Sequence, residues 1–271
     1  MPESPEVQAL ADELGERLHG RAFSGGEFEE FRVLKTPARP LASVAGRSVA
    51  RVRRFGKHVD LEMDDGSHLV VSFGRAGWAA WAPVAADAPA PVVAHFAFDG
   101  ADLELTDAGA WLSLGVSVVD DPSEVSTIAK LGADPLAPGY SRADFDRVVG
   151  SRRKQVKALL QEQESFAGIG NAYSDEILHT AKIAPLAHAA ALSGDERDRL
   201  YEAVVSVMGD ATAARRGIPI DQLKAEKVAS MRVHGRTGEA CPVCGTTIED
   251  LPGASGSSSA QYCPFCQSEP A

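Results

Sequence analysis

The chain of 271 residues lacks the features that mark several specialised classes of protein. No apolar run approaches the roughly 20 residues that a membrane-spanning helix needs, so we expect no membrane segment. No basic start followed by an apolar stretch precedes a small-residue cleavage site, so we expect no secretory signal and a cytoplasmic, nucleoid-associated location. Internal repeats are also missing. The hydrophobic fraction of 44% is that of an ordinary globular protein with one large or two medium cores.

Positive charge is in short supply. The chain has 27 Lys and Arg against 38 Asp and Glu, a formal net charge of -11, which at first argues against a nucleic-acid partner. The excess lies mainly in residues 1–140, where 12 basic side chains meet 21 acidic ones, whereas residues 141–271 hold 15 and 17. Basic residues cluster at 51–57, 152–157 and 232–236. Each cluster is either a solvated face or a local phosphate site, because salt confines the field of a patch to about 8–10 Å.

Cysteine is scarce, but its spacing is specific. The pattern is C-x2-C-x18-C-x2-C, formed by Cys241, Cys244, Cys263 and Cys266. This spacing is typical of a four-thiolate zinc site, and two disulfides or free thiols are the alternative. A closed four-cysteine site has no open coordination position, so we expect one structural Zn²⁺ that stabilises a small hairpin.

Hydrophobic periodicity separates a strand-rich first half from a helical second half. Residues 3–19 carry apolar positions at helical spacing, and short alternating segments between about 21 and 119 predict an antiparallel sandwich or barrel. A Pro/Gly linker at 135–139 follows. Helices are then predicted at 142–149, 152–163, 172–181 and 194–215. The division we expect is a first domain at 1–135, a helical domain at 136–228 and a zinc finger at 229–271.

A glycine-rich turn joins two of the predicted helices. Gly168 and Gly170 give the backbone conformational freedom, and Asn171 is a favourable N-cap for the helix that follows. Such a turn points backbone N–H groups at an anion, in line with the helix dipole. Taken alone, the turn also fits a simple chain reversal.

The first residues contain a group that can act as a nucleophile. If Met1 is removed, Pro2 has a free α-amino group with a pKa near 7.7–8.0, which allows it to form a Schiff base with an aldehyde. Glu3 stands beside it to move protons, and Glu6 lies one helical turn further on, where it can orient the amine. Ordinary helix initiation by Pro5 and acidic residues is the alternative.

Together these motifs resemble the formamidopyrimidine-DNA glycosylase/endonuclease VIII family over nearly the whole chain. The matching segments occur in the family order: Pro2–Val7, Arg53–Lys57, Lys157–Gln163, Gly168–Leu178 and Val233–Cys241. The resemblance implies an α+β fold. An N-terminal helix and an antiparallel β-sandwich precede a helix-two-turn-helix domain and a C-terminal zinc-finger β-hairpin.

The resemblance also implies a bifunctional DNA glycosylase and AP lyase of base-excision repair, acting on damaged double-stranded DNA as a monomer. Pro2 would attack C1′ of a damaged nucleotide, Glu3 would act as the acid and base, and β,δ-elimination would cut the strand. The flipped-out base would leave the stack. Phosphates flanking the lesion would be held by these residues: Lys57, Lys157, Gly170 and Asn171.

Two departures from the family pattern concern the grip on phosphate. The finger arginine expected five residues before the third cysteine is Ser258 here, which brings no charge. Arg232 or Arg236 is the candidate replacement. We therefore expect an enzyme that holds an altered site through few phosphate contacts.

Other departures concern the residues that replace the flipped base. The family methionine turn is Gly74-Arg75-Ala76-Gly77 here, so Arg75 either fills the gap or is a surface arginine. The family arginines are missing from residues 106–112, where we interpret Trp111 as core rather than as a wedge.

Residues 217–230 are shorter than the segment that caps 8-oxoguanine. Oxidised pyrimidines, ring-opened purines or bulkier lesions are the expected substrates. A DNA-binding member of the fold with little base excision is the competing hypothesis.

Overall fold

The computed structural model describes residues 2–84, 90–150, 152–255 and 258–268, apart from the side chains of 252–258. It divides into two compact units. Unit 1 is Met1–Lys130 with Arg215–Lys224, and unit 2 is Leu131–Ala214 with Ala225–Ala271. Each unit is described by itself. The three domains expected from the sequence stay a prediction.

Unit 1 begins with helix α1 (Ser4–Leu18), which starts at a capping box. The Glu3 carboxylate accepts from the first-turn backbone while Glu6 accepts from the backbone of Glu3, so each satisfies a free N–H group of the helix start. Its apolar face is fully buried at Val7, Leu10, Leu14 and Leu18. This face belongs to the hydrophobic core of the unit, which fixes the helix start relative to the sheets.

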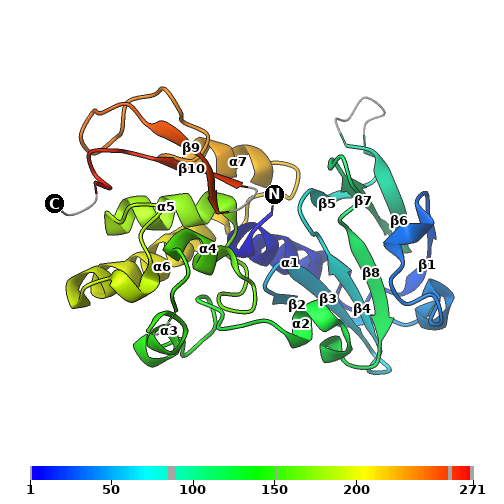
Figure 1. Cartoon of the computed structure of the whole chain (residues 1–271). Coiled ribbons are helices and arrows are strands. Elements are labelled where there is room, and N and C mark those ends of the chain that lie inside the picture. The colour runs from blue at the N-terminus through cyan, green and yellow to red at the C-terminus, as the bar shows by residue number, and fades with distance from the viewer. Residues whose placement is uncertain (1, 85–89, 151, 256–257, 269–271) are drawn as a thin grey trace. The chain divides into compact units, whose positions relative to one another are not determined.

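Two four-stranded antiparallel sheets make up the rest of unit 1 (Figure 1). One has the order β2 (Val49–Phe55), β3 (His58–Met63), β4 (His68–Ser72), β8 (Gly115–Val119). The other has the order β1 (Phe23–Phe28), β6 (Val92–Phe98), β7 (Ala101–Asp107), β5 (Gly77–Trp81). Short helices lie at α2 (Ser126–Ala129), η1 (Phe31–Val33), η2 (Leu41–Val44) and η3 (Pro122–Glu124). The antiparallel β structure predicted for 21–119 is confirmed.

Unit 2 has a helical region with its own core. Its helices are α3 (Arg142–Val149), α4 (Val156–Gln161), α5 (Asn171–Ala181), η4 (Ala189–Ala191) and α6 (Gly194–Arg215), whose last residue counts with unit 1. α7 (Leu223–Ser230) crosses the boundary at Ala225. The helix predicted at 152–163 is shorter, because Gln155 has a ψ of 139°, which is not helical, and pairs with His188 in an isolated bridge. No helix among the described residues is long and apolar enough to span a bilayer.

A β-hairpin of β9 (Glu249–Ser255) and β10 (Ser258–Tyr262) completes unit 2. Its strands contact α4 and α5 (Figure 1). Among the side chains that the structure describes, the core under it contains Val233, Cys241, Ile248 and Cys263, with Cys266 packed against them. So few apolar side chains cannot stabilise such a module alone, so the hairpin depends on its cysteine cluster.

Candidate active site

The start of α1 places two carboxylates beside Pro2. Pro2 is buried, and Glu3 and Glu6 are each 1% exposed. The backbone N–H of Glu3 donates to Oε2 of Glu6 over 3.1 Å, while Oε1 of Glu6 lies 3.6 Å from Nε of Arg215. Both side chains of this ion pair are buried, at 1% and 3% exposure. Glu6 is therefore fixed against the peptide that follows Pro2, which is the geometry an orienting carboxylate needs.

Arg54 ties this helix start to the turn that carries Lys57. Its guanidinium donates to Oε1 of Gln8 over 3.0 Å, to Oγ of Ser4 over 2.9 Å and to the carbonyl of Gly56 over 3.3 Å. Gly56 and Lys57 form a two-residue hairpin loop between β2 and β3, in which Gly56 has a φ of +54°. A positive φ at the first position of such a loop favours glycine. Lys57 is half-buried and held close to the start of α1.

Arg75 and Trp111 lie on two loops that share a hydrogen-bonding residue. Oγ of Ser113 accepts from the N–H groups of Arg75, over 2.9 Å, and Ala76, over 3.2 Å. Trp111 is 88% exposed, so its interpretation as a core residue is wrong. The predicted core role fails because the loop turns the indole outward while Leu112 packs against the core.

Asp107 builds the loop that exposes the indole. One carboxylate oxygen accepts from the N–H of Gly109 over 2.8 Å, and the other accepts from the N–H groups of Ser113 and Leu114 over 2.8 and 2.9 Å. Burial opposes ionisation, but these hydrogen bonds outweigh it and lower the pKa of Asp107. An ionised Asp107 therefore stabilises the loop at neutral pH.

The glycine-rich turn of unit 2 is braced by two glutamines. Gln163 accepts from the N–H of Gly168 over 2.9 Å and donates to the carbonyl of Ile169 over 2.6 Å. Gln161 donates to Oδ1 of Asn171 over 2.8 Å. The prediction of Asn171 as N-cap is wrong by one residue: Gly170 is the N-cap, with extended dihedrals, and Asn171 is the first helical residue. Asn171 is half-buried and rigidly placed at the start of α5.

Lys157 does not fit its expected role as a phosphate ligand. Its side chain is 0% exposed and pairs with Asp175, which is 1% exposed, and it also contacts Oγ of Ser174 over 3.2 Å. The other oxygen of Asp175 lies 2.7 Å from Nδ1 of His234. This ammonium therefore neutralises a buried carboxylate of α5 and has no surface to offer to DNA.

Glu176, the next residue of α5, binds the backbone of residues 232–234, which precede the cysteine hairpin. Glu176 is 5% exposed and accepts from the backbone N–H groups of Arg232, Val233 and His234 at 2.9 to 3.0 Å. The Arg232 side chain is left exposed. Arg236 is half-buried, 3.4 Å from Glu239, and donates to carbonyls of α7. The expected contact of Ser258 falls on a side chain outside the described residues.

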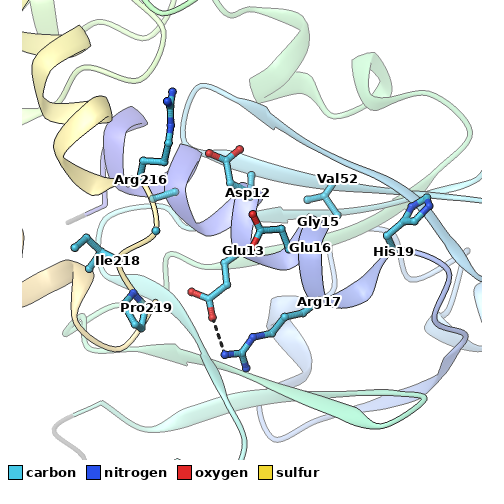
Figure 2. A pocket seen from close by; sticks show the side chains of 13 residues that line it. Asp12, Glu13, Gly15, Glu16, Arg17, His19, Val52, Arg216, Ile218 and Pro219 are labelled. Carbon is cyan, nitrogen blue, oxygen red and sulfur yellow. Dashed lines mark ion pairs between the residues drawn. The ribbon is translucent and has the colours of Figure 1, made fainter.

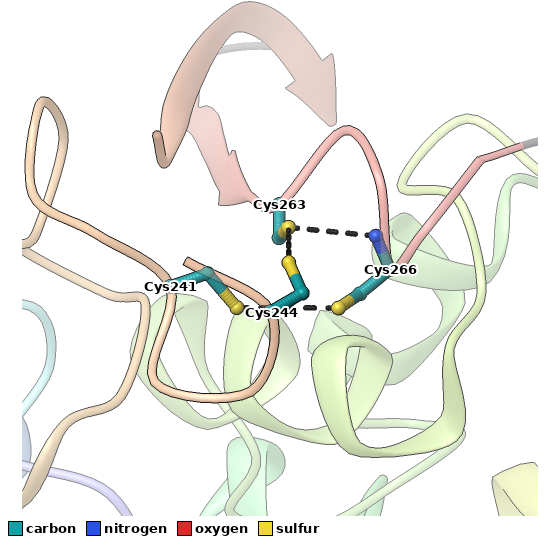
Figure 3. A group of neighbouring side chains, drawn as sticks. All are labelled: Cys241, Cys244, Cys263 and Cys266. Atoms are coloured by element: carbon teal, nitrogen blue, oxygen red, sulfur yellow. Dashed lines mark hydrogen bonds between the residues drawn. The ribbon is translucent and has the colours of Figure 1, made fainter. Parts of the chain in front are cut away.

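The four cysteines form a cluster suited to a tetrahedral metal (Figure 3). All four Sγ atoms lie within 4.8 Å of one another, with Cys241 and Cys266 4.0 Å apart and Cys244 and Cys263 3.4 Å apart. Metal–sulfur bonds of about 2.3 Å in a tetrahedron place sulfurs about 3.8 Å apart, so the set fits one zinc ion. The thiols are free, which excludes the disulfide alternative. Burial raises the pKa of Cys263 and Cys266, so metal binding there must displace protons.

A cavity of about 910 Å³ lies along α1 but contains none of the expected site residues (Figure 2). Its wall carries acidic and basic side chains, and Glu13 pairs with Arg17 over 3.4 Å. Glu13 also accepts from the indole N–H of Trp81 over 2.7 Å and from the N–H of Ile220 over 2.9 Å. These bonds give the carboxylate a structural role, so we do not place the active site in this cavity.

Several functional positions were missed at the level of sequence. Arg215 lies more than 200 residues from Glu6, and no local pattern connects the two. Asp107 had a usable signal, because an aspartate two residues before glycine is typical of a side-chain-bonded turn. Asp175 and Glu176 were part of the recognised motif, but their buried roles depend on His234 and the segment 232–234.

Comparison with known proteins agrees with this arrangement. Residues 1–111 match the family model described as the formamidopyrimidine-DNA glycosylase N-terminal domain, and residues 131–221 match the formamidopyrimidine-DNA glycosylase H2TH domain. An uncharacterized formamidopyrimidine-DNA glycosylase-like protein of Mycobacterium tuberculosis is 45% identical over 137 residues, 51% of this chain and 84% of that protein. The formamidopyrimidine-DNA glycosylase of Herpetosiphon aurantiacus is 31% identical over 281 residues, 98% of this chain and 100% of that protein.

Solved structures show the same fold. The Lactococcus lactis formamidopyrimidine-DNA glycosylase, crystallised non-covalently bound to DNA containing an AP site, superposes with a TM-score of 0.83. The match covers 98% of this chain and 100% of that chain at 24% identity. A proline–glutamate helix start, two antiparallel sheets, a helix-two-turn-helix region and a four-cysteine hairpin define a DNA-repair glycosylase class. Within that class, the chain belongs to the formamidopyrimidine-DNA glycosylase family.

Proposed function

We propose that this protein is a bifunctional DNA glycosylase and AP lyase of base-excision repair, with the N-terminal amine of Pro2 as its nucleophile. The observation that carries the proposal is the helix start in which Glu3 and Glu6 are both buried beside Pro2, with Glu6 paired to Arg215. A buried ion pair is a poor source of stability compared with apolar packing, so its presence here favours a positioning role.

The chemistry follows from these groups. The lone pair of the Pro2 nitrogen forms a bond to C1′ as the electrons of the glycosidic bond leave with the base, which takes up a proton from water. The proton on the resulting ammonium nitrogen passes to the Glu3 carboxylate. Glu3 then protonates the ring oxygen as the C1′–oxygen bond opens, which gives an iminium ion. Loss of a C2′ proton expels the 3′ phosphate, and a second elimination expels the 5′ phosphate. Glu6 acts by orienting the peptide between Pro2 and Glu3.

DNA is held by groups from both units in this proposal. Lys57, on its fixed turn, is the cationic phosphate ligand of unit 1, and the backbone at Gly170 with the Asn171 amide serves in unit 2. Arg75 and the exposed Trp111 fill the gap left by the flipped nucleotide, since an indole stacks on bases. Zinc at the four cysteines is structural and only holds the hairpin.

The lesion preference proposed from the sequence also gains support. Residues 217–230 form a short connection and helix α7. Ile220 of the connection and Leu223, the first residue of α7, are buried in the core of unit 1. A segment anchored in this way has little length left to cap a flipped 8-oxoguanine. Oxidised pyrimidines, ring-opened purines or bulkier lesions are therefore the proposed substrates rather than 8-oxoguanine.

Borohydride trapping tests the lyase proposal. The correctly processed protein, mixed with abasic duplex DNA and borohydride, should give a covalent adduct on a denaturing gel. Protein that retains Met1 should give none, because the Pro2 nitrogen is then part of a peptide bond. Protein that binds the duplex but gives no adduct would support the competing hypothesis of a DNA-binding protein without excision.

A further inference from the structure

His179 contacts the cysteine cluster from outside it. This residue of α5 is 3% exposed, and its Nε2 lies 3.3 Å from Sγ of Cys241. The other ring nitrogen, Nδ1, is buried and has no hydrogen-bond partner among the described side chains and backbone. A buried imidazole with a single polar contact, made to a metal-ligand sulfur, is not explained by the proposed catalytic chemistry.

The direction of the hydrogen bond between His179 and Cys241 is defined once the sulfur is a thiolate. A thiolate only accepts hydrogen bonds, so the proton of the neutral ring must lie on Nε2. Nδ1 is then a bare acceptor, which is compatible with a site that offers no acceptor for a second proton. Donors around a metal site fix the orientation of its ligands and tune the metal, and their loss typically costs 10–100-fold in metal affinity.

A second side chain secures the other half of the cluster to the same helix end. Gln267 is 1% exposed, and its Oε1 accepts from the N–H of Cys263 over 2.9 Å. Its Nε2 donates over 3.0 Å to the carbonyl of Ile183, just beyond the end of α5. Both Cys-x-x-Cys turns are therefore hydrogen-bonded to the C-terminal end of α5, one through His179 and one through Gln267.

We propose that His179 is a positioning residue of the zinc site, which donates its Nε2–H to the Cys241 thiolate and so couples the metal to α5. Asn171, Asp175 and His179 recur every four residues and share one face of this helix. The helix that starts at the proposed phosphate ligand thus ends on the metal site. This inference rests on the proposed zinc ion and is independent of the proposed lyase reaction.

Three variants of the full chain test the proposal. His179→Phe keeps a planar apolar ring but removes the donor, and His179→Gln places an N–H group near the position of Nε2. His188→Phe is the matched control, since the His188 side chain is exposed and its hydrogen bond, within the described part of the chain, is to the carbonyl of Arg153 over 2.8 Å. Zinc affinity is measured by competition with a chromogenic chelator, and the charge-transfer bands of the Co²⁺-substituted protein report the sulfur ligands directly.

The expected result is a 10–100-fold lower zinc affinity and shifted bands for His179→Phe, with near wild-type values for His179→Gln and His188→Phe. Wild-type affinity and bands in a folded His179→Phe variant would overturn the proposal. A folded His179→Gln variant whose zinc affinity falls 10–100-fold would also overturn it. If His179→Phe does not fold, the result for His179→Gln decides alone. Wild-type protein that binds no zinc overturns this inference but leaves the trapping test of the lyase intact.

Discussion

The buried ion pair between Lys157 of α4 and Asp175 of α5 gives a quantitative prediction. Asp175→Asn removes the charge that neutralises Lys157, a side chain with 0% exposure that cannot turn toward water. The carboxylate of Asp175 offers one oxygen to Lys157 and one to His234, whereas the amide of asparagine has a single oxygen. One of the two partners therefore faces an NH₂ group. Removing one partner of a buried pair typically costs about 3–5 kcal/mol, and we expect a loss of that size in unfolding free energy.

The assay is urea-induced unfolding followed by far-UV circular dichroism. Asp146→Asn is the matched control, because Asp146 pairs with Arg142 at 47% and 39% exposure, and exposed pairs contribute about 0–1 kcal/mol. Lys157→Met combined with Asp175→Asn removes the uncompensated charge, so the double variant should lose less than the sum of the single variants. A cost below about 1 kcal/mol for Asp175→Asn, or strict additivity, would refute this reasoning.

Three further predictions concern the loops and the metal. Asp107→Asn should cost about 1–3 kcal/mol at pH 7, because backbone donors lose their acceptor. Because the pKa of Asp107 is lowered in the folded protein, its contribution to the free energy of unfolding is complete above about pH 4. The contribution is lost as the pH falls through the pKa of the folded state. A difference in stability between Asp107→Asn and wild type that persists at acidic pH would contradict this assignment. Trp111→Ala should leave stability within about 0.5 kcal/mol but weaken abasic-DNA binding by about 1–3 kcal/mol in fluorescence anisotropy, whereas Phe31→Ala, at another exposed aromatic residue, should not weaken it. Chelation of zinc should remove hydrogen-exchange protection from residues 241–267 but not from β2–β4, and uniform loss would argue against a local metal effect.

Much of the fold could be predicted from the sequence because its signals are local. The periodicity of α1, the alternation in β2 to β4 and the cysteine spacing each depend on neighbouring residues. The helix predicted at 152–163 was too long because a bridge between Gln155 and His188, distant in sequence, keeps the chain extended. Trp111 was misassigned because large apolar side chains are usually buried. The aspartate–glycine spacing at Asp107 indicates a turn but does not show that the indole faces outward.

The residue types of the proposed site follow from sequence motifs, whereas the partners that hold these residues in place do not. Family motifs identify Pro2, Glu3 and Lys57, whereas Lys157 belongs to the motif and yet is buried by its pairing with Asp175. Arg215 and His179 act through partners far away in the sequence. Such pairings depend on tertiary packing, which a single sequence does not encode in any short pattern.

The central claim is that the amine of Pro2 forms the covalent bond to the damaged sugar. It is tested most directly by mass-spectrometric mapping of the borohydride-trapped adduct formed with abasic DNA. We predict that the modification lies on the N-terminal peptide, at the nitrogen of Pro2. A trapped adduct on Lys57 or any other lysine, or no adduct with correctly processed protein, would contradict it.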